Sequence, residues 1–459
     1  MPPLWSIAPF VLLLLMIAIM PMVRRCRGFW ARNRNKLFVA LAMSALTLLY
    51  YYFVHPSLPE GGAAGESGSR LGLIRHVLSG AILEAYIPFI ILLLALYTIS
   101  GGIRLEGDLA AHPLTNTTFL AIGGVLASFI GTTGAAMLLI RPLLETNSER
   151  RHVSHTVIFF IFVVCNIGGC LLPIGDPPLF LGYLKGVPFL WTLRLAIPWA
   201  FCTAVLLAIY YVWDVVMYRR EKPEDIRFDE ATRRPLRLTG KRNLLYLLGV
   251  ILAVGLLIPG KPLMFLRSFV VPEFLREAVM LALAGLSMLT TPREVRQANQ
   301  FTFAAIGEVA ALFLGIFITM QAPIEILQGK GPSLGLSKPW QFFWASGGLS
   351  SFLDNAPTYV VFFETANSLT HAPGEGILQL LSGHYIRTDL LVAVSLGAVF
   401  MGANTYIGNG PNFMVKTIAE ERGIRMPSFF GYMLYSIGIL IPLFLLVTIL
   451  FFVMKLGLV

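Results

Sequence analysis

The chain has 459 residues, of which 56% are hydrophobic and only 13% are charged. A soluble domain carries about 25% charged residues, so this composition excludes an ordinary water-soluble protein and indicates a membrane protein. The net charge of +10 does not indicate a nucleic-acid partner, because the basic residues cluster in short segments between long apolar runs, where they orient a membrane protein. The four cysteines form no CxxC pair, so neither a disulfide framework nor a zinc site is expected.

The apolar runs of the first 216 residues predict five membrane-spanning helices, because each run is long enough to cross about 30 Å of hydrocarbon. The first run has no basic segment before it and no small-residue cleavage site after it, so we expect a retained span rather than a signal peptide. The basic segment that follows it, 23–36, is placed in the cytoplasm. The expected spans lie near 4–23, 37–54, 85–101, 156–181 and 190–216.

We interpret the apolar stretch 118–145 as a re-entrant hairpin rather than a span. It is followed by the basic loop 147–155, which a single crossing would place outside the cell, against the usual distribution of positive charge. Its midpoint, "GTTG" at 131–134, contains residues that a tight turn needs. Two arms of about 12 residues are too short to span singly, which fits a hairpin that enters and leaves on the cytoplasmic side.

The most basic segment, 217–243, is predicted to be a cytoplasmic linker between two halves, 1–216 and 244–459. The second half contains a hairpin at 339–366, with "DNAP" at its middle, and this hairpin opens to the outside by the same counting. The chain is therefore expected to be an all-α polytopic membrane protein with about ten spans and two hairpins. The remaining expected spans lie near 244–259, 274–290, 302–322, 389–414 and 428–455.

Two matches between the halves predict an inverted repeat. In the hairpins, "GTT" (131–133) aligns with "DNA" (354–356), and four positions before these tips are identical. In the segments that follow, "GGCLLPIGDPPLF" (168–180) aligns with "MGANTYIGNGPNF" (401–413), which places Asp176 opposite Asn409. The identical positions are Gly124, Leu126, Ser128 and Phe129 with Gly347, Leu349, Ser351 and Phe352, and Gly169, Ile174, Gly175, Pro178 and Phe180 with Gly402, Ile407, Gly408, Pro411 and Phe413.

The spans 156–181 and 389–414 are expected to be broken helices, because Gly and Pro occur in them at a density that unwinds a helix. Unwound backbone at membrane depth is tolerated where it lines a cavity or is covered by protein. We therefore expect two hairpin tips and two broken helices to converge on one site for a small cation. The candidate oxygen ligands are Asp354, Asn355, Thr358, Thr132, Thr133, Asn166, Asp176, Asn404, Thr405 and Asn409, with Na⁺ expected at Asp354 and Asn355.

Each candidate also has a purely structural interpretation. Asp354 is a favoured residue for capping a half-helix, and Asp176, in "GDPP", can begin a turn. The hydroxyls of Thr132 and Thr133 can bond back to the helix backbone. Glu308, early in a span, is either a proton relay or a solvated glutamate at a helix start.

These motifs resemble the citrate-transporter-like proteins of the ion transporter superfamily, including the D-type bacterial sodium/proton antiporters. The similarity runs from about residue 85 to 430 and rests on "GTTGAAMLLIRPLL", "NIGGCLLPIGDPPLF", "LDNAPTY" and "GANTYIGNGPNFMVK". The resemblance implies an elevator-like transporter, often a homodimer, that resides in the bacterial inner membrane. In the antiporter branch a carboxylate-amide pair at a hairpin tip is linked to ion exchange, and Asp354-Asn355 match it. The carboxylate-transporting branch has Ser-Asn-Thr at each tip, which this chain lacks.

Three hypotheses follow, and none of them requires a cofactor. The first is Na⁺/H⁺ antiport, with Na⁺ or Li⁺ and H⁺ as transported ions, because the site has a titratable group and few features for a large anion. The second is sodium-coupled transport of a di- or tricarboxylate, which a negative Asp354 would oppose. The third is an intramembrane aspartyl protease that uses Asp176 and Asp354. We expect a transporter rather than an enzyme, with the lipid bilayer as its surroundings.

Overall fold

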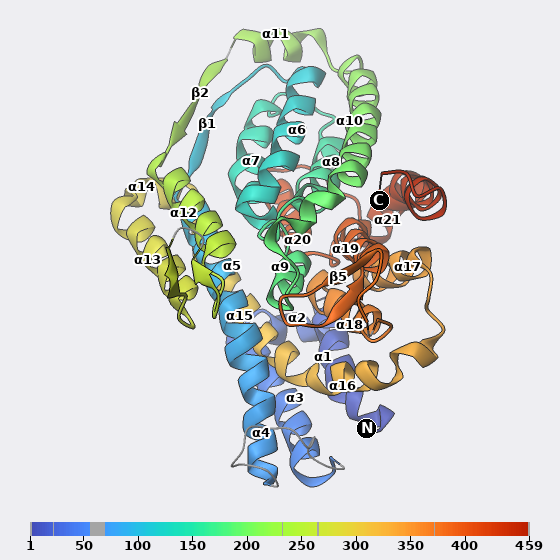
Figure 1. Ribbon diagram of the computed structural model, residues 1–459. Helices are drawn as coiled ribbons and strands as arrows, with labels where there is room; N and C mark the ends of the chain where they lie inside the picture. Colours follow the sequence, from blue (N-terminus) through green and yellow to red (C-terminus); the bar gives the residue numbers. More distant parts are fainter. Residues whose placement is uncertain are drawn as a thin grey trace.

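The computed structural model describes residues 2–21, 23–55, 69–231, 233–263, 266–370 and 372–457. In this part of the chain, helices are joined by short loops and by three two-stranded antiparallel ribbons (Figure 1). Within the described residues, five helices are long and apolar enough to cross a membrane. A sixth span is obtained if Ala304–Thr319 and Gln321–Leu334, bent by 41°, are counted together. The predicted all-α polytopic membrane protein is confirmed, whereas the number of about ten spans stays a prediction.

The first half begins with the short 3-10 helix η1 (Leu4–Ile7) and ends with an α-helix of 23 residues. Its elements are α1 (Ala8–Ile19), α2 (Arg24–Trp30), α3 (Asn33–Phe53), α4 (Arg70–Leu78), α5 (Ile87–Ser100), β1 (Arg104–Asp108), α6 (Pro113–Ile130), α7 (Thr132–Thr146), α8 (Ser154–Val163), η3 (Ile167–Cys170), α9 (Pro177–Leu184), η4 (Phe189–Leu195) and α10 (Ala196–Tyr218). The π-helical turn η2 (Ser79–Tyr86) makes α4 and α5 one continuous helix of 31 residues, longer than the span expected near 85–101.

The linker is structured and leads into the second half. Its helix is α11 (Pro223–Ala231), and its strand β2 (Arg234–Thr239) pairs with β1. The later elements are α12 (Arg242–Leu256), β3 (Pro262–Leu263), β4 (Leu266–Val270), α13 (Leu275–Thr290), α14 (Arg293–Ala298), α15 (Ala304–Thr319), α16 (Gln321–Lys330), α17 (Pro339–Ser350), α18 (Asn355–Asn367), β5 (Ile377–Gln379), β6 (Tyr385–Arg387), α19 (Thr388–Met401), η6 (Gly402–Asn404), α20 (Gly410–Glu421), α21 (Phe429–Tyr435), η7 (Ser436–Leu440), α22 (Ile441–Val447) and η8 (Thr448–Val453).

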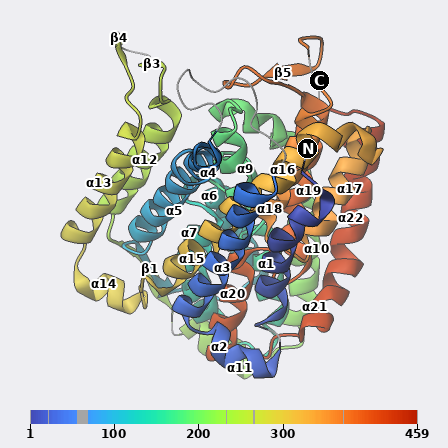
Figure 2. The same cartoon turned by 90° about the horizontal axis from the view of Figure 1, so that it is seen from below.

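The connecting segments gather at two opposite ends of the helix bundle. Figure 2 shows α2, β1 and α11 at one end, and the β3–β4 ribbon and β5 at the other. Of these, α2 and α11 belong to the basic segments that the charge pattern places in the cytoplasm. The segments with a predicted cytoplasmic position therefore lie at the same end, and the sidedness stays a prediction.

Both predicted hairpins form two helices joined at a polar tip. α6 and α7 are separated by Gly131 alone, and α17 and α18 by residues 351–354. The second hairpin has nearly the predicted bounds, but α6 starts at Pro113, five residues before the predicted hairpin. It is therefore 18 residues long and sufficient in length and composition to span, so the arm-length argument does not hold for it.

The two hairpins open toward opposite ends of the bundle. Near the end of α7, Glu145 pairs with Arg234 of the linker strand. α18 instead packs on β6, the partner strand of β5, which lies at the other end of the molecule in Figure 2. This opposite orientation supports the proposal of an inverted repeat.

Aligned positions of the halves also make equivalent contacts. The hydroxyl of Ser128 donates to the carbonyl oxygen of Gly168, and that of Ser351 donates to the carbonyl oxygen of Met401. Both broken helices are present, as α8–η3–α9 and α19–η6–α20. The helix that follows each break packs on the hairpin of the other half, α9 on α18 and α20 on α7. The repeated pattern is what two copies of one unit, related by a pseudo-two-fold axis, would give.

Candidate functional site

Asp176 is the centre of the site where the two halves meet. Its carboxylate is 1% exposed and accepts hydrogen bonds from three side chains. The hydroxyl of Thr132 donates to Oδ1 over 3.0 Å, and the Asn409 amide donates to the same oxygen over 3.1 Å. The Asn355 amide donates to Oδ2 over 2.6 Å. One residue from each hairpin tip and one from each broken helix therefore meet, as the sequence predicted.

Each of these residues stands at the start of a helix. Thr132 and Asn355 are the first residues of α7 and α18, while Asp176 and Asn409 are the N-caps of α9 and α20. Prolines in the first turn of α9 and α20 favour helix initiation there, because the missing amide hydrogen would have no partner in any case. The sequence therefore breaks the helices at these positions and aims their amino ends inward.

The hydrogen-bond donors to Asp176 are neutral, and its electrostatic environment consists of helix dipoles and the nearby carboxylate of Asp354. Four helix amino termini, each carrying partial positive charge, converge on the carboxylate. Among the described residues, no lysine, arginine or histidine forms an ion pair with Asp176 or Asp354. A buried carboxylate without a cationic side chain is costly unless it is protonated or accompanied by a bound cation.

A second layer of amides surrounds the first. The Asn409 amide donates to Asn166 Oδ1 over 3.3 Å, and the Asn166 amide donates to Asn412 Oδ1 over 2.8 Å. Asn412 in turn donates to the backbone oxygens of Gly402 and Thr405. Sequence reasoning missed Asn412, although it lies inside the quoted "GANTYIGNGPN". The available signal was that it replaces Leu179, its apolar counterpart in the first half.

Asp354 occupies a different environment from Asp176. It is half-buried, and its Oδ1 accepts the Ala356 amide over 3.1 Å, which is an N-cap of α18. The Thr358 hydroxyl donates to the carbonyl oxygen of Asp354. Thr133, the residue that follows Thr132 at the first tip, is half-buried. The geometry therefore gives Asp354 and Thr358 a capping arrangement and places Asp176 at the convergence point.

Asn404 and Thr405 lie behind the second tip. Asn404 donates to the Ser351 hydroxyl, and the Thr405 hydroxyl donates to the Ser351 carbonyl oxygen. They border a cavity of about 230 Å³, whose lining is otherwise largely apolar: Trp344, Gly348, Ser351, Phe352, Met401, Met433, Ser436, Ile437 and Ile441. These two residues support the tip through Ser351, and Thr405 also reaches the second layer through its carbonyl oxygen.

Glu308 lies outside this convergence. Its carboxylate pairs with the buried Lys36 of α3 over 2.7 Å, and its side chain is 44% exposed. The structure thus joins Glu308 to a neighbouring helix and not to Asp176. A proton-relay role for it stays a prediction.

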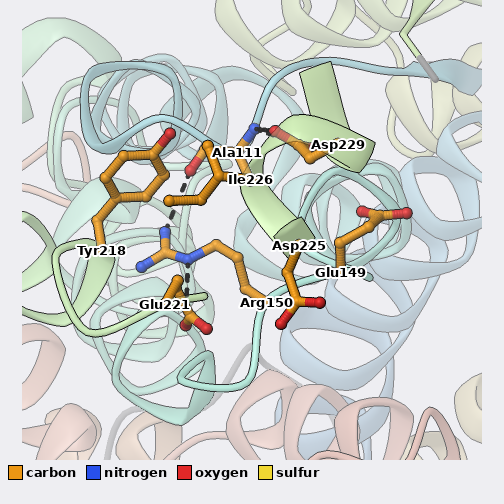
Figure 3. Close-up of a pocket in the computed structure, with 8 residues that line it drawn as sticks. All are labelled: Ala111, Glu149, Arg150, Tyr218, Glu221, Asp225, Ile226 and Asp229. Carbon is orange, nitrogen blue, oxygen red and sulfur yellow. Dashed lines mark hydrogen bonds and ion pairs between the residues drawn. The ribbon is translucent and has the colours of Figure 1, made fainter. Parts of the chain in front are cut away.

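A second polar cluster lies between the linker and the base of the first hairpin (Figure 3). Arg150 pairs with Asp214 of α10 over 2.6 Å and lies 3.8 Å from Glu221. Asp229 of α11 accepts the Ala111 amide. Burial alone would raise the pKa of the Glu221 carboxyl, but hydrogen bonds from the backbone amides of His152 and Arg151 and from the His152 ring lower it below its usual value. The cluster docks the linker and is separate from Asp176.

Comparison with known proteins adds one finding. A family model described as "Putative citrate transport" matches residues 1–452, nearly the whole chain. No curated protein matches the chain.

Proposed function

Since the chain belongs to the putative citrate transport family, it is a secondary transporter and an integral multi-pass membrane protein, and we propose that it exchanges a small monovalent cation, Na⁺ or Li⁺, for a proton. Asp176 is the exchange group in this proposal. It binds the cation when ionised and the proton when the cation has left. The sequence favoured Asp354 for this role, but Asp176 is the carboxylate to which all four helix breaks contribute.

The proposal rests on a buried carboxylate that lies beside a buried amide oxygen for which the described residues supply no hydrogen-bond donor. Asp176 has only neutral hydrogen-bond donors, and no donor among the described residues reaches Asn355 Oδ1. A buried acceptor without a partner costs free energy, and a proton or a dehydrated cation beside it removes that cost. Carboxylate, amide and hydroxyl oxygens are hard ligands that suit an alkali cation.

A second candidate is carboxylate transport, which the family description favours. Four converging helix amino termini also form an environment that attracts an anion. In this structure Asp176 itself occupies their focus, so a carboxylate substrate would compete with it unless Asp176 were protonated. Citrate is therefore the second candidate and cation exchange the first. The protease hypothesis gains no support, because each aspartate bonds to its own separate partners.

We further propose an elevator-like movement in the bacterial inner membrane. Both hairpins and both broken helices pack on one another, so they can move as one unit. α12 and α13 lie to one side of this unit (Figure 1). A homodimer, as the resemblance implies, would give the moving unit a fixed partner, and its test is the mass of the purified protein in detergent.

The test of the function is proton movement in proteoliposomes with an imposed pH gradient, to which Na⁺, Li⁺, K⁺ or citrate is added in turn. The wild type should dissipate the gradient with Na⁺ or Li⁺, and Asp176→Asn should abolish the response. Asp354→Asn should keep most of it, and Glu224→Gln, at an exposed position of α11, serves as a control outside the site. Uptake of labelled citrate with no cation response would reject exchange and establish the second candidate.

A further inference from the structure

Two side-chain amides face the Asp176 carboxylate, and they are held in different ways. Asn409 donates to Oδ1 and Asn355 donates to Oδ2, so both present nitrogen to the carboxylate. An amide can turn by half a rotation and present oxygen instead, if its other contacts allow it. Whether each amide can turn is decided by the groups behind it.

Asn412 is fixed by the backbone. Its Nδ2 donates to the carbonyl oxygens of Gly402 over 2.8 Å and Thr405 over 2.9 Å. Carbonyl oxygens only accept hydrogen bonds, so the nitrogen must face them. The oxygen of Asn412 must then face Asn166.

This orientation propagates to Asp176. Asn166 must direct its nitrogen to Asn412, and that nitrogen also donates to the Ile161 carbonyl oxygen over 2.8 Å. Its oxygen therefore faces Asn409, whose nitrogen contacts both Asn166 Oδ1 and the Cys165 carbonyl oxygen. Turning Asn409 would place oxygen against two oxygens. The amide of Asn409 is thus locked with nitrogen toward Asp176.

Asn355 has no comparable restraint. Its side chain is fully buried, and its one hydrogen bond among the described residues is the 2.6 Å bond to Asp176. Its Oδ1 has no donor in that part of the chain. Neither carbonyl oxygens nor a second amide fix which end of Asn355 faces the carboxylate.

We propose that Asn355 is a rotating ligand and Asn409 a fixed donor, with Asn166 and Asn412 as the positioning residues that lock Asn409. This assignment rests on the proposed cation exchange. With Asp176 ionised and the site empty, Asn355 donates its N–H to the carboxylate. When a cation binds, or when Asp176 takes a proton, Asn355 turns its oxygen toward the cation or the carboxyl O–H.

The exchange balances one charge for one charge. The proton that leaves Asp176 is released to water as the cation enters, and one positive charge accompanies the carboxylate in either loaded state. The rotation of Asn355 supplies an oxygen ligand to the cation without moving the backbone of the second tip. The first half has a threonine at the aligned position, and its hydroxyl both donates and accepts without rotation.

The experiment compares Asn355→Leu with Asn409→Leu in Na⁺-driven proteoliposome exchange, measured as KM for Na⁺ and as a pH profile. Both variants remove a donor from ionised Asp176, so both pH profiles should move toward alkaline pH. Only Asn355→Leu removes a cation ligand, so its KM should rise about tenfold or more, against less than about threefold for Asn409→Leu. Equal KM values for the two variants would overturn the assignment.

A rescue variant guards against misfolding. Asn355→Thr introduces the residue of the first tip, whose hydroxyl can donate or accept, and it should keep KM within about threefold of the wild type. If both leucine variants fail to reach the membrane, a tenfold rise in KM for Asn355→Thr overturns the assignment. A wild type without any Na⁺ response refutes the proposed function itself, so the wild-type measurement separates the two failures.

Discussion

The two hairpin tips occupy equivalent places in the fold and have different chemistry. Thr132 and Asn355 stand at aligned positions, and both donate to the same carboxylate. Asp176 and Asn409 are also aligned, but one is the acceptor and the other its donor. The comparison shows that the repeated backbone geometry brings the four residues together, while one acidic residue, present in only one half, makes the site asymmetric.

The turns at the two tips also differ. The first is closed by Gly131 alone, at φ 78° and ψ 149°, a conformation that residues with a side chain adopt only under strain. The second takes four residues, and its last, Asp354, has an ordinary φ of −55°. The first tip therefore depends on the backbone freedom of glycine, whereas the second depends on a side-chain cap.

The largest expected effect comes from moving the carboxylate between the halves. Asp176→Asn should reduce cation-driven exchange by at least about 100-fold, because the titratable group is lost. The double variant Asp176→Asn with Asn409→Asp restores one carboxylate at the aligned position, yet it should not restore exchange. A carboxylate at 409 would face the oxygens of Cys165 and Asn166, which offer no proton.

Proteoliposome exchange and citrate uptake are measured in parallel for these variants. Recovery of exchange in the double variant would show that the two halves are chemically interchangeable and that the second amide layer does not fix the polarity of the site. The single variant Asn409→Asp, which has two facing carboxylates, is the matched control for added charge.

Much of the fold could be predicted from the sequence, because helix breaks are encoded locally. The second hairpin and both broken helices lie close to their predicted bounds, since Gly, Pro and Asp at the breaks act within a few residues. The start of the first hairpin was placed five residues late, at 118 instead of Pro113. There, His112 accepts the Leu114 amide and proline begins the helix, a local signal within a polar stretch.

The carboxylate at the centre could not be predicted, because it depends on contacts between residues far apart in the chain. Asp354 and Asp176 both sit at helix starts, and local sequence does not reveal which of them faces the other half. Asn355 reaches Asp176 across 179 positions, and Asn166 reaches Asn412 across 246. Convergence could be expected from the repeat, but the centre of the convergence required the packing of α9 on α18.

The next largest effect concerns two ion pairs, each of which joins the helix after a break to the hairpin of the other half. Lys185, the C-cap of α9, pairs with Glu364 of α18 over 2.8 Å, and Arg422, the C-cap of α20, pairs with Glu145 of α7 over 2.9 Å. Glu364 is only 3% exposed, whereas Glu145 is 39% exposed. Glu364→Gln should therefore cost about 2 kcal/mol of stability, and Glu145→Gln less than about 1 kcal/mol.

Thermal unfolding of the purified protein in detergent measures both changes. Raising the salt concentration should weaken the exposed pair more than the buried one, because water and ions screen the exposed charges. Similar losses of stability for Glu364→Gln and Glu145→Gln would mean that burial does not determine how much each ion pair contributes.

Effects of similar or smaller size should separate the two turns. Gly131→Ala should cost about 1–3 kcal/mol, since alanine must adopt the glycine conformation, although the nearest atom to the new Cβ is at an ordinary 3.6 Å. Asp354→Ala should cost about 1 kcal/mol through the lost cap and should leave exchange within a few-fold of the wild type. Loss of exchange in Asp354→Ala with unchanged thermal stability would return the exchange role to Asp354.

The last effect concerns the base of the first hairpin and depends on pH. The base of the first hairpin is joined to the linker through Glu221, whose pKa is lowered in the fold by the amides of His152 and Arg151. A lowered carboxyl pKa stabilises the fold at neutral pH, and this contribution is lost as pH falls through the folded-state pKa. Glu221→Gln should therefore cost about 1 kcal/mol of stability at pH 7 and almost nothing in strong acid.

Limited proteolysis of the linker at a series of pH values measures this loss of stability, with Glu224→Gln, an exposed neighbour on α11, as the matched control. A cost that does not change with pH would mean that Glu221 acts through shape rather than charge.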